Sequence, residues 1–268
     1  MNRCTKQIAA EVTRRTHGGL AEGVRLLASA VSVPRPSAPS SPRTAVRRRT
    51  GGFTRTDLVV ALASVSVLAS IGWAAWTSTR RKARTTQCLS SVATVGRAIL
   101  DFARDSEDTL PQAPANDTRD IWWWYKEQVR KYAGLAGPSS PDDKVFACPD
   151  DRGYSDPKPF HQNPRFDFTS YVFNGVTLPS VPNIAGWRTS EIVDPKRTLL
   201  VMEWTAHGPL SWHRSRTGRK NLPFYDGALS VLGFVDGHVR FAPVHYDGHN
   251  AAFTRDPAPG YEYRYSGK

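Results

Sequence analysis

Cysteine is the first residue type in this sequence with clear chemistry, and the chain has three, Cys4, Cys88 and Cys148. They form no Cys-x-x-Cys pair and show no cysteine–histidine spacing typical of zinc sites. If Cys4 is removed with a leader, the remaining pair suits one disulfide in an oxidising compartment. That bond would close a loop of about 60 residues. The alternative is that Cys88 and Cys148 are unpaired, small hydrophobic side chains.

Histidine and carboxylate side chains recur in the last third of the sequence. Asp-Gly-His occurs at 236–238 and again at 247–249, with His245 nearby. Such groups bind metals, but no spacing here is diagnostic, and two turns with exposed imidazoles are the simpler interpretation. Three further candidates for hydrolytic chemistry, Glu203, His207 and His213, have no mutual geometry that the sequence fixes. With no nucleophile elbow, P-loop or dinucleotide fingerprint either, we predict no enzyme activity, no cofactor and no metal site.

Three consecutive tryptophans, Trp122, Trp123 and Trp124, form an unusual aromatic cluster. Adjacent side chains cannot all face one core, so one or two should lie at an edge. An indole at an edge can stack on a sugar or on a partner chain. The cluster is therefore a candidate partner surface, and packing in the core and at its rim is the alternative.

Asp57 is a single carboxylate at the start of a long apolar segment. Leu58–Trp76 contains 19 residues without a charge, and a helix of that length extends about 28 Å, close to the hydrocarbon thickness of a bilayer. Trp73 and Trp76 lie near its end, where indoles favour the membrane interface. Four basic residues then end the run: Arg80, Arg81, Lys82 and Arg84. We predict one transmembrane helix; a buried core helix and a cleaved signal peptide are the alternatives.

Positive charge is concentrated before this segment. The net charge is +12, and residues 1–52 carry ten Lys or Arg and two acids, or +8, which leaves +4 for residues 53–268. So mild an excess is not typical of a protein that binds a polyanion, and we predict no nucleic-acid partner. Residues 31–43 are rich in Pro, Ser and Ala, which is typical of a disordered linker.

The order of residues around Gly52 resembles a known processing signal. Basic residues precede Gly52 and Phe53, an acid follows at Asp57, and the apolar segment comes next. This pattern resembles the signal of type IV prepilins and type II secretion pseudopilins. The resemblance implies cleavage after Gly52 by a prepilin peptidase/methyltransferase, N-methylation of Phe53 and a role for Asp57 in subunit assembly. The family usually has glutamate there, one methylene longer. A carboxylate in lipid is costly unless it is paired, and a neighbouring subunit's terminal ammonium is a suitable partner.

Two later motifs resemble a pseudopilin-like group of the planctomycete type. FACPDD at Phe146–Asp151 is similar to the group's Cys-Pro-x-Asp, and GFVDGHVRF at Gly233–Phe241 is similar to its Phe-x-Asp-Gly-His-Val. The group also has a histidine about ten residues before its Asp-Gly. Here His213 precedes Asp236 by 23 positions, so no role is carried over to it.

These residues must be positioned by a small set of elements. Apolar residues at helical spacing follow Cys88 and predict that the membrane helix continues, as one helix of about 50 residues, until Pro111. A second helix is expected over 120–132. Strands are expected over 169–176 and 197–204.

A hairpin is predicted around Asp236-Gly237, a two-residue turn in which both residues need positive φ. In that register Val235 faces His238. Four apolar residues then share the core face, namely Leu232, Phe234, Val239 and Phe241, and His238 lies on the other face.

The prediction is an α+β fold in which a long N-terminal helix, half in the membrane and half amphipathic, packs on an antiparallel, pilin-like sheet. The regions are a leader or disordered basic extension (1–52), a transmembrane and stalk helix (53–110) and a globular head (111–268). The resemblance implies a subunit of a pseudopilus or pilus-like assembly in the bacterial inner membrane, or of a surface filament. Its head lies outside the cytoplasm, and its partners are the peptidase, like subunits and the bilayer. The alternative is an envelope protein whose head binds carbohydrate or another surface partner.

Overall fold

The computed structural model describes residues 52–114, 121–176, 178, 180–214, 224–248 and 255–268. The leader predicted over residues 1–52 therefore lies, apart from Gly52, outside the described residues. Residues 56–268 form one compact unit.

The dominant element is helix α2 (Arg55–Asp105), an unbroken helix of 51 residues with Asp57 in its first turn. Its N-terminal half is apolar and exposed: Leu68 is 70% and Ile71 62% exposed. The serine hydroxyls in this half donate hydrogen bonds to backbone carbonyls of the same helix; Ser64 Oγ, for example, donates to the Val60 carbonyl at 2.8 Å. From Cys88 onward the helix buries one face against the head. The expected single helix of about 50 residues is confirmed, and it is long and apolar enough to cross a membrane.

Helix α2 ends six residues before Pro111, the predicted end. Glu107 and Asp108 adopt positive φ of 54° and 65°, which α-helical geometry does not allow. The Asp108 carboxylate is held by Ser190, whose backbone nitrogen and hydroxyl donate to it at 3.0 and 2.6 Å. A contact between residues distant in sequence therefore decides where the helix ends.

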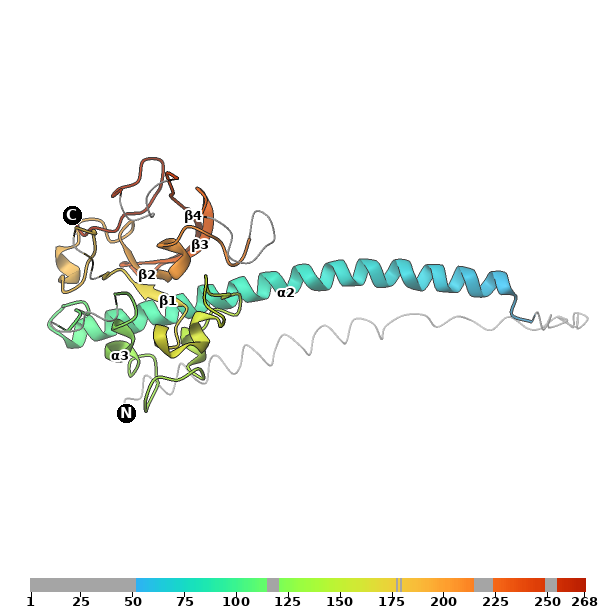
Figure 1. Ribbon diagram of the computed structural model, residues 1–268, viewed down its shortest axis with the longest axis horizontal. Helices are drawn as coiled ribbons and strands as arrows, with labels where there is room; N and C mark the ends of the chain where they lie inside the picture. The colour runs from blue at the N-terminus through green and yellow to red at the C-terminus, as the bar shows by residue number, and fades with distance from the viewer. Residues whose placement is uncertain (1–51, 115–120, 177, 179, 215–223, 249–254) are drawn as a thin grey trace, which may run out of the picture. The chain divides into compact units, whose positions relative to one another are not determined.

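The head contains one antiparallel sheet in the order β1-β2-β3-β4. The strands are β1 (Tyr171–Phe173), β2 (Leu199–Glu203), β3 (Ala228–Phe234) and β4 (Val239–Val244). Figure 1 shows the sheet and α3 (Tyr125–Val129) gathered around the C-terminal half of α2. Short 3-10 helices connect these elements: η2 (Lys144–Phe146), η3 (Phe160–Gln162), η4 (Pro164–Phe166), η5 (Thr189–Glu191) and η6 (Trp204–Ala206). The predicted α+β arrangement, a long helix on an antiparallel sheet, is confirmed, although α3 is much shorter than the expected helix over 120–132.

Two glycines, Gly96 and Gly233, lie where α2 meets the sheet. A Cβ at Gly233 in β3 would lie 2.9 Å from Val92 Cγ1 on α2 and 2.9 Å from the Val201 carbonyl oxygen. A Cβ at Gly96 on α2 would lie 3.5 Å from Val201 Cγ1, an ordinary contact distance. Only the sheet side of this contact therefore requires glycine.

The predicted register of the β3–β4 hairpin is wrong by one residue. Gly233 pairs with Val239, and Val231 with Phe241. The Phe234 nitrogen donates to the His238 carbonyl, so three residues, not two, form the loop. Of the Asp236-Gly237 pair only Gly237 has positive φ, 90°, as in a three-residue hairpin with a glycine bulge. The extra loop residue separates the face of Phe234 from that of Phe241. His238, next to the hairpin loop, is exposed, and its ring stacks on that of Phe234 with 4.2 Å between centroids.

The tryptophan cluster lies largely inside the head. Trp123 and Trp124 are each 6% exposed, and Trp122 is half-buried. Trp123 packs on Phe166 with ring centroids 4.7 Å apart, and Trp124 meets Phe173 edge to face. Two of the three rings therefore serve the core, as in the alternative of packing in the core and at its rim, and a partner surface at Trp122 stays a prediction.

Candidate functional site

The imidazole of His213 lies between two carboxylates. Its Nε2 is 2.8 Å from Glu203 Oε1 and its Nδ1 is 3.0 Å from Asp150 Oδ2. The side chain of His213 is 1% exposed and that of Glu203 is fully buried, whereas Asp150 keeps 16% of its side chain exposed. The three side chains form a buried acid–histidine–acid triad.

Three separate segments place these side chains. Glu203 is the last residue of β2, and its second oxygen accepts the Val231 backbone N–H from β3 at 2.9 Å. Asp150 follows Cys148 and Pro149 in a loop, where the Cys148 N–H donates to Ser170 Oγ. His213 lies in the chain that follows η6. Sheet pairing and loop hydrogen bonds therefore hold the segments that carry the two carboxylates on either side of the imidazole.

The triad carries charge at neutral pH. Burial by itself would lower the pKa of His213, but the negative charge of Glu203 and hydrogen bonds to Asp150 and Glu203 outweigh it and raise the pKa to about 9. Burial would raise the pKa of Asp150, and here the hydrogen bond and positive charge of His213, with help from Arg84, lower it. A protonated His213 therefore donates one hydrogen bond to each carboxylate. Charge-assisted hydrogen bonds of this kind are stronger than neutral ones.

Helix α2 joins the triad through a disulfide and two polar side chains. Cys88 and Cys148 are bonded, with Cα atoms 5.1 Å apart. His213 Nε2 is 3.9 Å from Cys148 Sγ, so the disulfide and the triad are in contact. Arg84 lies 3.4 Å from Asp150 Oδ1, and Thr85 Oγ1 lies 3.4 Å from His213 Nδ1. A covalent link and an ionic link thus attach the stalk helix to the head at one place.

The two cysteines and two residues of the triad together have the composition of a metal-ligand set. One ligand atom from each of Cys88, Cys148, Glu203 and His213 lies within 4.8 Å of the others. A cysteine binds metal as a thiolate, and these two sulfurs are joined to each other. The oxidised arrangement therefore supplies a crosslink.

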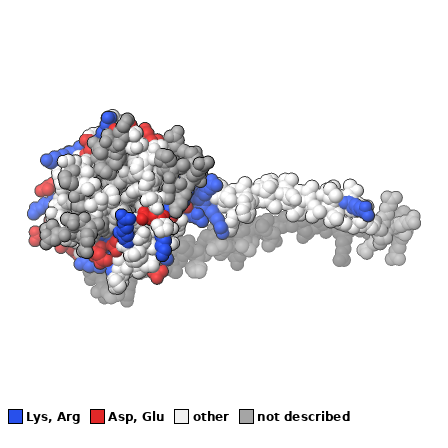
Figure 2. Space-filling model, viewed as in Figure 1, with Lys and Arg blue, Asp and Glu red and all other residues white. Residues whose placement is uncertain are grey.

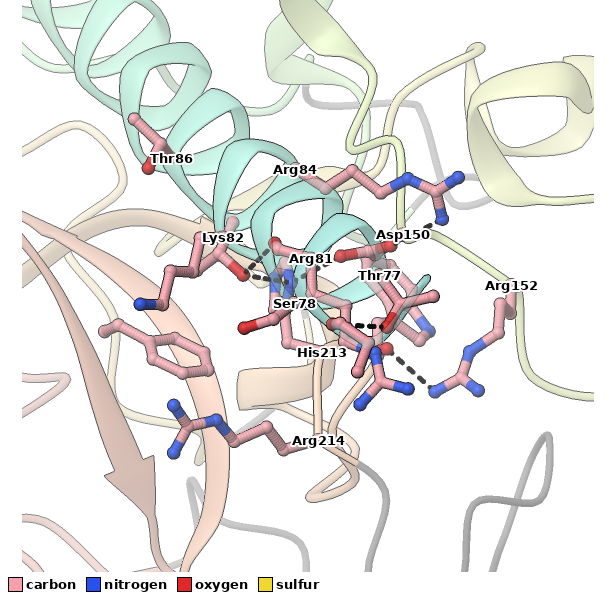
Figure 3. A pocket seen from close by; sticks show the side chains of 14 residues that line it. Thr77, Ser78, Arg81, Lys82, Arg84, Thr86, Asp150, Arg152, His213 and Arg214 are labelled. Carbon is pink, nitrogen blue, oxygen red and sulfur yellow. Dashed lines mark hydrogen bonds and ion pairs between the residues drawn. The ribbon is translucent and has the colours of Figure 1, made fainter. Parts of the chain in front are cut away.

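A groove of about 1040 Å³ opens beside the triad, between α2 and the head. Its α2 side includes Arg81, Lys82 and Arg84, and its head side includes Arg152 and Arg214. Figure 3 shows the basic side chains around α2, with Arg84 and Arg152 on one side and Lys82 and Arg214 on the other. Among the lining residues that the structure describes, Asp150 alone is acidic.

The residues predicted for processing lie elsewhere. Gly52 and Phe53 precede α2, where Phe53 is 76% exposed, and Asp57 lies in the first helical turn. The disulfide residue Cys88 and the contacts of the triad with Arg84 and Thr85 lie beyond the other end of the apolar half, more than 25 residues further along α2.

Those histidines singled out by sequence that the structure describes do not share one site. His238 pairs with its neighbour Asp236 at 2.6 Å, and His245 lies 3.5 Å from Asp226. His207 is buried beside Tyr265, and burial lowers its pKa to about 3. His249, in the second Asp-Gly-His, is outside the described residues.

Sequence reasoning missed the triad. The sequence offers Glu203 and His213 as candidates without a mutual geometry, and Asp150 stands only at the variable position of the Cys-Pro-x-Asp motif. One signal was available. Glu203 ends an otherwise apolar strand, LLVME, and a carboxylate at a fully buried strand position requires a partner.

Comparison of the chain with protein-family models, with curated proteins and with solved structures finds no significant match.

Proposed function

We propose that this protein is a membrane-anchored, prepilin-like subunit that is cleaved after Gly52 and assembles with like subunits into a pseudopilus or pilus-like structure. The supporting observation is the abrupt change of environment along α2. Residues 58–76 are apolar and exposed, whereas from Cys88 the same unbroken helix is buried against the head. A surface of this size without charge is unfavourable in water and suits lipid or neighbouring helices.

The start of α2 suits subunit assembly. Cleavage after Gly52 would leave a new terminal ammonium at Phe53, four residues from Asp57. A carboxylate at the membrane boundary is stabilised by such a cation on a neighbouring subunit. The disulfide and the triad attach the head to the helix, so packing of the helices of neighbouring subunits would also determine where their heads lie.

The alternative of a carbohydrate-binding head is less well supported. It depends on exposed indoles, and Trp123 and Trp124 are buried.

The mature N-terminus tests this proposal. The full chain is expressed in a bacterium that has a prepilin peptidase, extracted from membranes and analysed by mass spectrometry. We expect a first residue of N-methylated Phe53. An intact leader on a protein that is soluble without detergent would overturn the proposal.

A matched pair of variants tests the role of Asp57. Asp57→Glu restores the length usual in the family and should retain crosslinking between subunits in membranes, whereas Asp57→Asn should lose most of it. Equal crosslinking of the two variants would exclude a role for the charge in assembly.

A further inference from the structure

The basic groove between α2 and the head lies apart from the predicted cleavage site and from Asp57, since none of these residues lines it. Of the 14 described residues that line it, five are Lys or Arg and one, Asp150, is acidic. Asp150 is already engaged by His213 and Arg84. The groove therefore presents an excess of positive charge to whatever enters it.

Several of these cations have no carboxylate partner among the described residues. Arg81 and Lys82 are exposed on α2, and no ion pair within the described part of the chain involves them. Arg214 lies over the Phe241 ring, 5.9 Å from its centroid. Arg152 donates to the carbonyl groups of Ser211 and Trp212, which leaves its charge uncompensated.

The groove also lies at a defined position along the helix. Its first lining residue, Ala74, belongs to the apolar segment that ends at Trp76, and Thr77 and Ser78 follow. Arg80 covers the Trp76 ring at 4.5 Å. With a rise of 1.5 Å per residue, Arg81, Lys82 and Arg84 lie roughly 7 to 12 Å beyond Trp76. If residues 58–76 are in the hydrocarbon, this is the depth of the lipid headgroups and the water next to them.

Figure 2 shows the same order on the surface. Basic side chains gather where the stalk leaves the head, and a long uncharged stretch of α2 follows. The hollow thus reaches the apolar segment at Ala74 and has its α2 cations roughly two to three turns further along the helix. That combination matches a phospholipid, whose phosphate is anionic and whose acyl chains are apolar.

We propose that this groove binds the phosphate of an anionic phospholipid, with Arg81 and Lys82 from the helix and Arg152 and Arg214 from the head as the cationic ligands. The inference rests on the membrane anchoring in the proposed function, although not on cleavage or filament assembly. Bound lipid would join stalk and head on the side of the disulfide and would fix the height of the head above the bilayer.

The test uses the full chain purified in non-ionic detergent and native mass spectrometry with an equimolar mixture of phosphatidylglycerol and phosphatidylcholine. We expect phosphatidylglycerol adducts to dominate. In the variant Arg81→Gln/Lys82→Gln the preference should fall by about fivefold per cation removed, or roughly twenty-five-fold in total. Both positions are exposed and make no described side-chain contact, so the fold should be kept, as an intact disulfide would verify.

The control variant is Arg97→Gln/Arg104→Gln, which removes two exposed cations from α2 outside the groove and should keep the preference. Equal binding of the two lipids, or the same loss in both variants, would overturn the proposal. Two competitors, inorganic phosphate and an oligoglutamate peptide, test whether the bound anion is a phospholipid. If either one displaces the lipid at equal concentration, the assignment to phospholipid is overturned.

Carbonate extraction of membranes measures insertion separately. Release of the protein by carbonate would count against membrane anchoring, whereas lipid selectivity in detergent still reports on the groove. Failure of the membrane-anchoring proposal is therefore distinguishable from failure of the lipid-binding proposal.

Discussion

His213 Nε2 lies 2.8 Å from Glu203 Oε1, and both side chains are almost completely removed from solvent. A buried charge is tolerated when its partner is present and is costly when the partner is lost. Since Asp150 holds the other ring nitrogen and Cys148 contacts the imidazole, this pair lies at the attachment of helix to head.

Loss of His213 should destabilise the head strongly. His213→Gln leaves the Glu203 and Asp150 carboxylates close together without the cation, and we expect about 3–5 kcal/mol less free energy of unfolding. Denaturant titration in detergent, followed by tryptophan fluorescence, measures the change. His238→Gln is the control, since His238 is exposed and should change stability by about 0.5 kcal/mol or less. Similar values for the two variants would contradict the assigned role of the triad.

Stability should decrease as the solution becomes alkaline. The pKa of His213 is raised from 6.5 to about 9 in the folded protein, so the folded state binds this proton more tightly than the unfolded state. The resulting stabilisation is complete below pH 6.5 and is lost as the pH rises through about 9. The expected decrease is about 3 kcal/mol. Unfolding free energies measured from pH 6 to pH 10 should show it in the native protein and not in His213→Gln.

The Cys88–Cys148 disulfide should contribute through the loop that it closes. The two residues are 60 positions apart, and the loop-entropy model gives roughly 4 kcal/mol for a loop of that size. We expect Cys88→Ala/Cys148→Ala to lose about this amount, and the native protein to lose a comparable amount in a strong reductant. Peptide mapping without reduction checks the bond itself. Free thiols at both positions in protein recovered from the cell would refute it.

Gly96 and Gly233 lie at the same helix–sheet contact, and substitution by alanine should change the stability of the protein in opposite directions at the two positions. At Gly233 a Cβ would meet Val92 and the Val201 carbonyl at 2.9 Å, and overpacking of this kind costs about 1–3 kcal/mol. At Gly96 the contact distance is ordinary, and alanine is favoured over glycine within a helix by up to about 1 kcal/mol. Gly96→Ala should therefore raise the unfolding midpoint and Gly233→Ala should lower it. Destabilisation of both by the same amount would mean that α2 packs differently.

A charge in the middle of the apolar half of α2 should impair membrane insertion. Leu68→Arg places a cation near the centre of residues 58–76, at a cost of about 2.5–3.5 kcal/mol on insertion scales. We expect a larger fraction of the variant to be released from membranes by carbonate. Gln87→Arg, on an exposed position of α2 outside the apolar segment, should remain membrane-bound. Unchanged extraction of Leu68→Arg would argue that this segment is not in lipid.

Local sequence patterns predicted the elements well where one periodicity runs without interruption. Residues 58–76 have no charge, and the apolar positions after Cys88 keep the helical repeat, so the single helix could be predicted. The strands were located to within a few residues by their β-branched and aromatic content. The short 3-10 helices, and the end of α2 at Asp105 instead of near Pro111, depend on contacts such as Asp108 with Ser190, which no local pattern contains.

The sequence by itself determined the long helix, its apolar half and the antiparallel character of the head, because these follow from hydrophobic periodicity and turn residues along neighbouring positions. The tertiary structure alone decided the triad, the burial of Trp123 and Trp124, the hairpin register and the basic groove. Each of these depends on residues from separate segments, and their distances are set by packing of the helix on the sheet. A near-neutral average charge over residues 53–268 also concealed a local excess, because charges far apart in sequence converge only when the chain folds.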